Sequence, residues 1–348
     1  MKKVLIISLG RNGGLPNYAS SIIKELEGVE YDVLISKQAT ANYGLDHTIV
    51  MSTYSGILSF LFRTLFYLPF KFMMLLPKMC REYNTLYLPY NHFWALPFMI
   101  LFRILGRKVV ITIHDGILHE GENNKWLQLD SDLKIKLATD VIFLTVFVKN
   151  QVINRMKANK RLHIIPHGIY ENEFVTIKEQ HLSKNILFVG RIGKYKGVEL
   201  LIDAASDILP DFDQLIIAGK SLYPIVNRST SESIKIKDKF LTDEEIGALL
   251  SWADILVIPY LEATQSGVIT LGIYAELPMV CTKVGGLQEQ LKSDECIWVE
   301  PNKESLKTGL LSLLNDKDLF WSLKHKMALK KKEFSWNEVS KLITQVFK

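Results

Sequence analysis

One short glycine-rich stretch carries the clearest chemical signal in this sequence. Residues 186–189 are apolar and predict a buried strand, and an apolar helix is expected from residue 198 onward. The loop between them holds, in order, Gly190, Arg191, Gly193, Lys194, Lys196 and Gly197. Glycines let a backbone approach a ligand closely, a helix N-terminus offers N–H groups, and Arg and Lys supply positive charge. The stretch therefore predicts a site for an anionic group such as phosphate; a solvated turn with scattered basic residues is the alternative.

Two further groups of residues follow predicted strands. The β-branched run 109–113 predicts a buried parallel strand that ends in His114 and Asp115. Near the start, strand 4–8 passes into a turn that contains Gly13 and Gly14. Open α/β sheets bind ligands at the carboxyl ends of their strands, so both groups are candidates for a site. A buried histidine satisfied by a neighbour and a plain strand-to-helix connector are the respective alternatives.

The stretch Phe-Val-Gly-Arg-Ile-Gly-Lys-Tyr-Lys-Gly at 188–197 resembles the donor-binding loop of family 4 glycosyltransferases with the GT-B fold. Other segments resemble that family in the same order along the chain, namely 111–115, 164–169, 253–260 and 277–287. The resemblance covers nearly the whole chain and is strongest from 164 to 287. It implies an α/β fold of two Rossmann-like domains that face each other across a cleft, with a C-terminal helix that crosses back to the first domain.

The resemblance also implies roles for matched residues. Arg191 and Lys196 would bind the diphosphate of a nucleotide-sugar donor and stabilise the departing nucleotide. His114 would meet the donor sugar near the reacting carbon, and Glu262 would touch the same sugar, so these four are the expected catalytic residues. The expected donor-binding residues are Gly13, Gly14, Gly190, Gly219, Ser266, Gly267, Val268, Ile269 and Thr270.

The sequence departs from the family pattern after Glu262. The family usually has a second glutamate, separated from the first by seven residues, that contacts the ribose, and no glutamate fills that position here. The ribose contacts and the identity of the nucleotide are therefore left open. The start of the helix at 266–270 still offers N–H groups to an anion. We expect no metal and no cofactor, because the cation pair makes a metal unnecessary.

Composition bounds the remaining possibilities. A chain of 348 residues with 48% apolar and 23% charged residues fits two globular domains. A formal net charge of only +5 gives no reason to expect a nucleic-acid partner. Three cysteines, an odd number, fit a reducing cytosol better than a disulfide framework. The apolar start is short and runs into glycines, so it reads as a first strand rather than a signal peptide.

The segment 55–81 differs from an ordinary soluble enzyme. It is almost wholly apolar except for Arg63, Lys71, Lys78 and Arg81, which fall within roughly an 80° arc of a helical wheel. These cations leave no uncharged run long enough to span a bilayer. A basic stripe opposite an apolar face is typical of a helix that lies in the membrane interface. The alternative is a core helix whose one polar face meets water.

These observations predict a first, acceptor-side domain over 1–172, a donor-binding domain over 173–328 and a returning helix over 329–348. We expect a retaining, metal-independent glycosyltransferase that moves a sugar from a UDP- or GDP-linked donor to a lipid-linked or growing surface polysaccharide. It would be cytoplasmic, attached peripherally to the inner face of the cell membrane through an anionic lipid surface, and would need no protein partner. An inactive sugar-nucleotide-binding subunit, a soluble enzyme with a small acceptor, and a phosphorylase or epimerase of the same fold are the alternatives.

Overall fold

The computed structural model describes residues 3–44, 48–116, 125–154, 156, 160–178, 183–226, 229 and 231–348. It divides the chain into two compact units. The first comprises Met1–Pro166 together with Trp336–Lys348, and the second comprises His167–Ser335. The chain thus passes between the units after Pro166 and after Ser335, where the sequence analysis placed the divisions after residues 172 and 328. Each unit is described here by itself.

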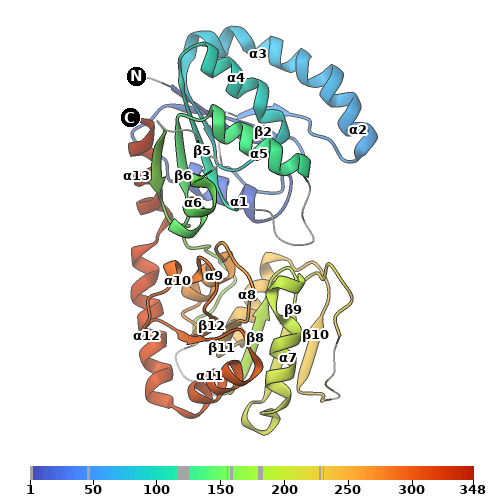
Figure 1. Ribbon diagram of the computed structural model, residues 1–348, viewed down its shortest axis with the longest axis vertical. Helices are drawn as coiled ribbons and strands as arrows, with labels where there is room; N and C mark the ends of the chain where they lie inside the picture. The colour runs from blue at the N-terminus through green and yellow to red at the C-terminus, as the bar shows by residue number, and fades with distance from the viewer. Residues whose placement is uncertain are drawn as a thin grey trace. The chain divides into compact units, whose positions relative to one another are not determined.

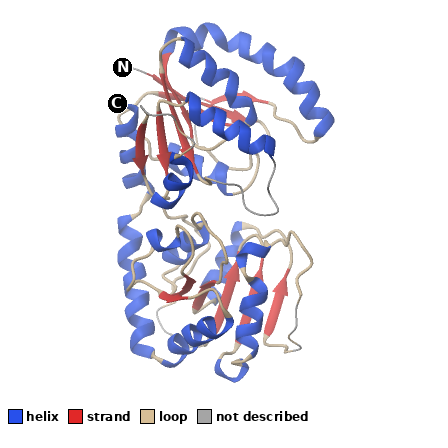
Figure 2. Ribbon diagram, in the orientation of Figure 1, coloured by secondary structure: helices blue, strands red, loops and turns tan. Residues whose placement is uncertain are grey.

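The first unit is built on a seven-stranded parallel sheet (Figures 1 and 2). Its strands are β1 (Lys3–Ser8), β2 (Tyr31–Ser36), β3 (Thr48–Met51), β4 (Tyr83–Leu88), β5 (Lys108–Ile113), β6 (Asp140–Phe143) and β7 (Arg161–Ile164). Their order across the sheet is β3-β2-β1-β4-β5-β6-β7. The inner strands are buried on both faces, as expected where helices cover a parallel sheet on both sides.

Helices cover the two faces of this sheet. α1 (Gly14–Lys24) and the last helix, α13 (Trp336–Phe347), pack together, and the Ser340 hydroxyl donates to the Ile22 carbonyl at 3.0 Å. α4 (Leu96–Ile104) places Phe98 and Phe102 in the core formed with Leu86 and Val109. Two further helices of the unit are α5 (Lys125–Leu137) and α6 (Val146–Ile153). The expectation that the last helix returns to the first domain is confirmed.

A long helical segment, Ile57–Glu82, runs along the first unit beside α4 (Figure 1). It consists of α2 (Ile57–Phe62), a π-helical turn at Arg63–Tyr67 and α3 (Leu68–Glu82). The π turn lies directly before Pro69, which cannot donate a backbone hydrogen bond to the preceding turn. The sequence analysis expected a helix here.

The second unit has a six-stranded parallel sheet of order β10-β9-β8-β11-β12-β13. Its strands are β8 (Asn185–Val189), β9 (Gln214–Ala218), β10 (Ile234–Lys237), β11 (Ile255–Ile258), β12 (Met279–Thr282) and β13 (Ile297–Val299). Its α-helices are α7 (Val198–Ser206), α8 (Asp243–Trp252), α9 (Gly267–Tyr274), α10 (Leu287–Gln290), α11 (Lys303–Asn315) and α12 (Lys317–Glu333). Two parallel-sheet α/β units were predicted, and that fold is confirmed.

Both sheets reverse their strand order at one point. In the first the reversal lies between β1 and β4, and in the second between β8 and β11. Loops that leave neighbouring strands at such a point run in opposite directions and leave a crevice at the carboxyl ends of the strands. Every candidate site residue from the sequence analysis follows a strand at that edge or begins the helix after it.

Candidate functional site

Two glycines bring the ends of β8 and β9 unusually close together. Gly190 and Gly219 have φ values of 123° and 146°, which other residues rarely adopt. The Gly190 N–H donates to the Ala218 carbonyl at 3.0 Å. A Cβ atom at Gly219 would lie 1.9 Å from the Gly190 carbonyl oxygen, so no side chain fits there. The two strand ends therefore present bare backbone to whatever lies at this edge.

The cationic loop after β8 is fixed by a second close approach. Lys194–Lys196 forms a 3-10 turn, and Gly197 follows it with φ 64°. A Cβ atom at Gly197 would lie 2.0 Å from the Pro259 carbonyl oxygen. The Leu261 N–H donates to the Tyr195 carbonyl at 2.7 Å, which ties the loop to the segment after β11. The loop therefore has a defined conformation.

The two cations of the loop are placed differently. The Arg191 side chain is exposed, whereas Lys196 is half-buried. Lys196 Nζ lies 3.6 Å from the centroid of the Tyr260 ring and 5.1 Å from that of Tyr195. An aromatic face attracts a cation, so the two rings help to position the Lys196 ammonium at this edge.

Glu262 and the start of α9 lie beside this loop. Ser266 caps α9 by accepting a hydrogen bond from the Val268 N–H at 3.2 Å. Gln290 holds both sides of Ser266, because it accepts from the Ser266 N–H at 2.7 Å and donates to its carbonyl at 3.0 Å. A Cβ atom at Gly190 would lie 3.2 Å from Val268 Cγ2, so the first turn of α9 adjoins the glycine-lined strand ends.

Two of the predicted donor-binding side chains point into the protein. Ile269 and Thr270 are buried, and the Thr270 hydroxyl donates to the Gly267 carbonyl at 2.8 Å and accepts from the Tyr170 N–H at 3.3 Å. Any contribution of these two residues at the strand edge must therefore come from their backbone N–H groups.

The predicted residues of the first unit form a separate group. Gly13, with φ 93°, precedes α1, which begins at Gly14. The turn before them is fixed by Tyr90, whose hydroxyl accepts from the Gly10 N–H at 2.7 Å and contacts Ser8 Oγ at 2.8 Å. A Cβ atom at Gly10 would lie 2.8 Å from that hydroxyl, so only glycine fits here.

His114 follows β5 and is buried. Its Nε2 donates to the Pro89 carbonyl at 2.9 Å, and the Tyr18 ring meets it edge-on at 4.6 Å. Burial lowers the pKa of His114, although the Pro89 hydrogen bond and the nearby Asp115 carboxylate raise it. The imidazole is therefore neutral near pH 7, with its proton on Nε2.

Sequence reasoning missed several residues that position these groups. Tyr90 holds the Gly10 turn, Pro89 holds His114, and Gln290 holds Ser266. Nothing in the local pattern identifies them, because their partners lie 80, 25 and 24 residues away. Strand β4, which delivers Pro89 and Tyr90, was also missed, although the apolar residues at 86–88 are a signal for it.

The sequence analysis singled out no Asp-X-Asp metal motif, although three such triplets occur, at 130–132, 211–213 and 316–318. Asp130 accepts from Lys134 at 2.5 Å, and Asp213 accepts from the Lys184 N–H at 3.2 Å. Over the described part of the chain, no cluster of three His, Cys, Asp or Glu side chains is arranged to hold a metal ion.

Comparison with known proteins identifies related sequences for part of the chain. Residues 183–316 match the family model described as glycosyl transferases group 1. An uncharacterized glycosyltransferase of Methanocaldococcus jannaschii is 30% identical over 186 residues, which cover 50% of this chain and 47% of that protein. A GDP-mannose:glycolipid 4-beta-D-mannosyltransferase of Xanthomonas campestris pv. campestris is 28% identical over 123 residues, covering 33% of this chain and 35% of its own. The chain spans about half the length of the first of these curated relatives.

Solved structures match over the full length. Anabaena HepE, in complex with UDP and glucose, superposes with a TM-score of 0.78 at 16% identity, covering 99% of both chains. Sucrose-phosphate synthase of Thermosynechococcus elongatus gives a TM-score of 0.76 at 16% identity, covering 100% of this chain and 98% of its own. The chain therefore has the GT-B fold, and residues 183–316 of its second unit are similar to the glycosyl transferases group 1 family.

Proposed function

We propose that this protein transfers a sugar from a UDP- or GDP-linked donor to a lipid-linked or growing surface polysaccharide. Transfer would retain the anomeric configuration, need no metal, and take place at the inner face of the cell membrane. The relatives support this class of reaction, since one is named for transfer from GDP-mannose to a glycolipid and a structural neighbour holds UDP and glucose. The retaining, family 4 chemistry rests on the resemblance of 188–197.

The observation that carries the proposal is the glycine-lined edge of the second sheet. Transfer breaks the bond between the sugar's anomeric carbon and the diphosphate oxygen, and the nucleotide leaves with that electron pair. Negative charge therefore grows on the diphosphate in the transition state. Arg191, Lys196 and the N–H groups at the start of α9 would stabilise this charge, and the rings of Tyr195 and Tyr260 hold Lys196 in place before the reaction. Gly190 and Gly219 leave the ends of β8 and β9 without side chains, so the diphosphate would meet backbone there.

His114 and Glu262 would act on the sugar. A neutral imidazole with its proton on Nε2 leaves Nδ1 as an acceptor for a sugar hydroxyl. Glu262 is exposed beside the cationic loop and can accept hydrogen bonds from hydroxyl groups. Gly13 and Gly14 would let the donor or the acceptor approach the first sheet closely.

The test is a screen of UDP- and GDP-sugars with the purified protein, using mass spectrometry to detect the released nucleotide and the transferred sugar. Each reaction is run after exhaustive dialysis, with and without excess chelator, and Arg191→Ala serves as the inactive control. We expect release of one nucleotide above the control, unchanged by chelator. Absence of release with every donor would refute transfer, and activity restored only by Mn²⁺ or Mg²⁺ would refute the metal-independent mechanism.

A sugar-nucleotide-binding subunit without activity is the second candidate. It is favoured by α9, Gly267–Tyr274, which contains no glutamate to contact a ribose. Donor-induced thermal stabilisation without turnover, over the same panel of donors, would support this candidate and refute the first.

A further inference from the structure

The helical segment Ile57–Glu82 turns its apolar side to solvent. Its outward residues come in adjacent pairs that recur every four residues: Ile57 and Leu58, Leu61 and Phe62, Leu65 and Phe66, Pro69 and Phe70, and Met73 and Met74. Ile57 and Leu58 are 81% and 84% exposed, and the other large apolar residues of this set are at least half exposed. Only 6% of the most apolar stretch of the helix is buried. We call these residues the outer face.

Two of the four basic residues of the segment, Arg63 and Lys78, lie on the opposite side, against the first unit. Arg63 donates to the Thr53 carbonyl at 2.8 Å, and Lys78 pairs with buried Asp32 at 2.7 Å. The sequence analysis expected the basic stripe to meet the membrane or water. The structure corrects that expectation for Arg63 and Lys78. Part of the apolar surface, including Leu68 and Met79, packs into the core of the first unit as the alternative expected, whereas the outer face is exposed.

The π-helical turn keeps the outer face continuous. A four-residue repeat drifts around an ordinary α-helix, because 3.6 residues make one turn. The wider turn at Arg63–Tyr67 offsets part of that drift, so that residues on both sides of it remain on one side. Thr64 and Tyr67 fix the opposite side of this turn, since Thr64 accepts from Trp94 Nε1 at 2.9 Å and Tyr67 accepts from the Ser52 N–H at 3.0 Å.

Exposed basic residues lie at the ends of α3 and of its neighbour α4. Arg81 and Arg103 are exposed at the ends of α3 and α4, and Ile104 beside Arg103 is 77% exposed. An extended apolar strip with basic residues at its margin complements an anionic lipid bilayer, whose interior is apolar and whose headgroups are negatively charged.

We propose that the outer face inserts into one leaflet of an anionic membrane, with the helix lying in the plane of the surface. By length and composition it is the one helix among the described residues that could cross a bilayer. Its inner side, however, packs Leu68 and Met79 into the core and is bonded to β2 and to the segments around Thr53 and Trp94, which holds it along the domain. This inference deepens the membrane part of the proposed function and rests on it only for the lipid-linked acceptor.

Hydrophobic insertion predicts a particular response to salt and lipid charge. The outer face bears aliphatic, aromatic and thioether groups with no strong hydrogen-bonding group among the pairs, so its binding to acyl chains is insensitive to salt. The basic margin contributes an attraction that is screened by salt. We therefore expect the protein to float with phosphatidylcholine–phosphatidylglycerol liposomes, and to remain more than half bound in 1 M NaCl.

The experiment compares flotation of four forms of the full-length protein. The triple variant Phe62→Ser/Phe66→Ser/Phe70→Ser should lose at least tenfold in liposome affinity at every salt concentration. Arg81→Glu/Arg103→Glu should lose affinity only at low salt. Phe240→Ser, at an 81% exposed position of the second unit, is the matched control and should bind as the parent does. Equal flotation of the parent and the triple variant would overturn the proposal.

A label on the outer face gives an independent test that does not need the triple variant to fold. Phe66→Cys is made in a Cys80→Ser background, because Cys80 is the exposed cysteine, and is labelled with nitrobenzoxadiazole. The emission of the label should rise and shift to the blue when liposomes are added. An emission spectrum that stays the same would contradict insertion. A parent that is dimeric in solution, ignores liposomes and becomes monomeric in the triple variant would show that a second copy covers this face instead.

Donor hydrolysis in detergent-free buffer separates this inference from the proposed function. The triple variant should hydrolyse the nucleotide-sugar as the parent does, because the outer face does not contact the donor. Liposome binding by a protein without any transfer or hydrolysis would refute the proposed function alone. Transfer by a parent that does not bind liposomes would refute the membrane inference alone.

Discussion

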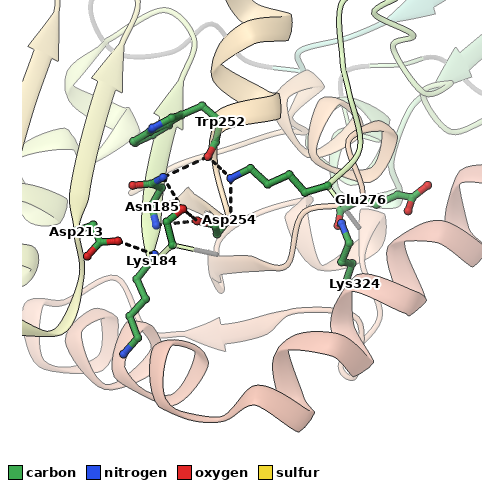
Figure 3. Close-up of polar contacts among 9 residues, drawn as sticks. Lys184, Asn185, Asp213, Trp252, Asp254, Glu276 and Lys324 are labelled. Atoms are coloured by element: carbon green, nitrogen blue, oxygen red, sulfur yellow. Dashed lines mark hydrogen bonds and ion pairs between the residues drawn. The ribbon is translucent and has the colours of Figure 1, made fainter. Parts of the chain in front are cut away.

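The two ends of the second sheet both carry charged groups, but they use them differently. At the amino ends of the strands, Asp254 is buried and accepts from Lys178 at 3.0 Å, from the Ser183 hydroxyl at 2.9 Å and from the Asn185 N–H at 2.9 Å (Figure 3). At the carboxyl ends, glycines keep side chains away, and the Lys196 ammonium lies over aromatic rings.

The difference separates a structural cluster from a binding one. Asp254 fixes the segment that enters the second unit onto the start of β11, and its carboxylate is satisfied by groups of the same chain. The cavity beside it, lined in part by Lys178 and Lys324, is only about 10 Å³, room for about one water molecule. The carboxyl end instead offers bare backbone and the cationic side chains of Arg191 and Lys196. Charge alone therefore does not distinguish the two ends; the glycine-lined backbone at the carboxyl end does.

The largest expected effect is the loss of transfer in Arg191→Ala or Lys196→Ala. Removing one preorganised cation from a leaving diphosphate should cost on the order of 3 kcal/mol, a hundredfold or more in rate. Initial rates with a radiolabelled donor give the effect, and thermal unfolding should match the parent. Lys194→Ala is the control from the same loop, because Lys194 is exposed there, and it should retain most of the activity.

A loss of rate in Lys194→Ala equal to that in Arg191→Ala would contradict the specific placement of the cations. It would indicate that the loop acts only through its net charge.

Asp254→Ala should lower the stability of the fold without lowering the rate, the opposite of what we expect for Arg191→Ala. It leaves a lysine, a hydroxyl and a buried backbone N–H without their acceptor, so the free energy of unfolding should fall by about 2–3 kcal/mol. The rate per folded molecule should be unchanged. Urea unfolding and a rate assay on the same sample measure both quantities. Asp213→Ala is the matched control at the same end of the sheet; its carboxylate is exposed, and the change should stay within about 0.5 kcal/mol.

A rate loss in Asp254→Ala as large as that in Arg191→Ala would remove the distinction between the two ends of the sheet.

Much of the fold was predictable because its strands are unusually apolar. The runs before Ser8, His114 and Gly190 indicate buried parallel strands, and the glycines and cations after them mark the edge at which a site is expected. Strand β4 was not predicted, since Asn84 and Thr85 interrupt its apolar pattern and a long apolar helix precedes it.

The spacing of apolar and basic residues in the segment Ile57–Glu82 did not predict which of its faces turns toward the protein. A repeat shows that a helix has two unlike faces, but not which face turns inward. Here the inward face is decided by partners distant in sequence, since Lys78 meets Asp32 and Thr64 meets Trp94. α13 is also amphipathic, yet it buries its apolar residues, including Val339 and Ile343. The same distance in sequence explains why Tyr90 and Gln290 were missed.

A buried polar cluster around Lys134 in the first unit offers a further test, because its contribution to stability should depend on pH. Lys134 is fully buried and donates to Asp130 at 2.5 Å, to Asn91 Oδ1 at 2.6 Å and to the His92 carbonyl at 2.7 Å. Burial lowers the pKa of Lys134 from 10.5 to about 8, although Asp130 opposes the shift.

The direction of the pH dependence follows from the number of protons bound by the folded and the unfolded chain. Between pH 8 and 10.5 the unfolded chain holds a proton on Lys134 that the folded chain has lost, so the free energy of unfolding rises with pH. Equilibrium unfolding from pH 8 to 9.5 should show a gain of about 1 kcal/mol that is absent in Lys134→Met. That variant should also be less stable at pH 7, because it leaves Asp130 buried without its partner. A parent profile that is flat or falls over this range would contradict the lowered pKa.

The smallest expected effect lies at Glu276, at the amino end of the second sheet. Its φ of 56° makes it the one non-glycine residue with positive φ in the described part of the chain. Glu276 ends α9 in a turn where its own N–H donates to the Ile273 carbonyl at 3.1 Å and the Leu277 N–H donates to the Gly272 carbonyl at 2.9 Å. Glycine is favoured at such a position because it has no Cβ atom to strain the left-handed conformation.

Glu276→Gly should therefore stabilise the protein by about 0.5–1 kcal/mol, after the larger entropy of glycine in the unfolded chain is subtracted. The change removes a 3.9 Å ion pair with Lys331, which contributes little, and keeps the backbone carbonyl that accepts from Lys324 at 3.4 Å. Glu276→Ala removes the same carboxylate but keeps the strain, so it should not be stabilised in urea unfolding. Equal gains in both variants would assign the effect to charge rather than to backbone strain. The rate of transfer should be unchanged in both, because this end of the sheet contributes to the stability of the fold and not to the site.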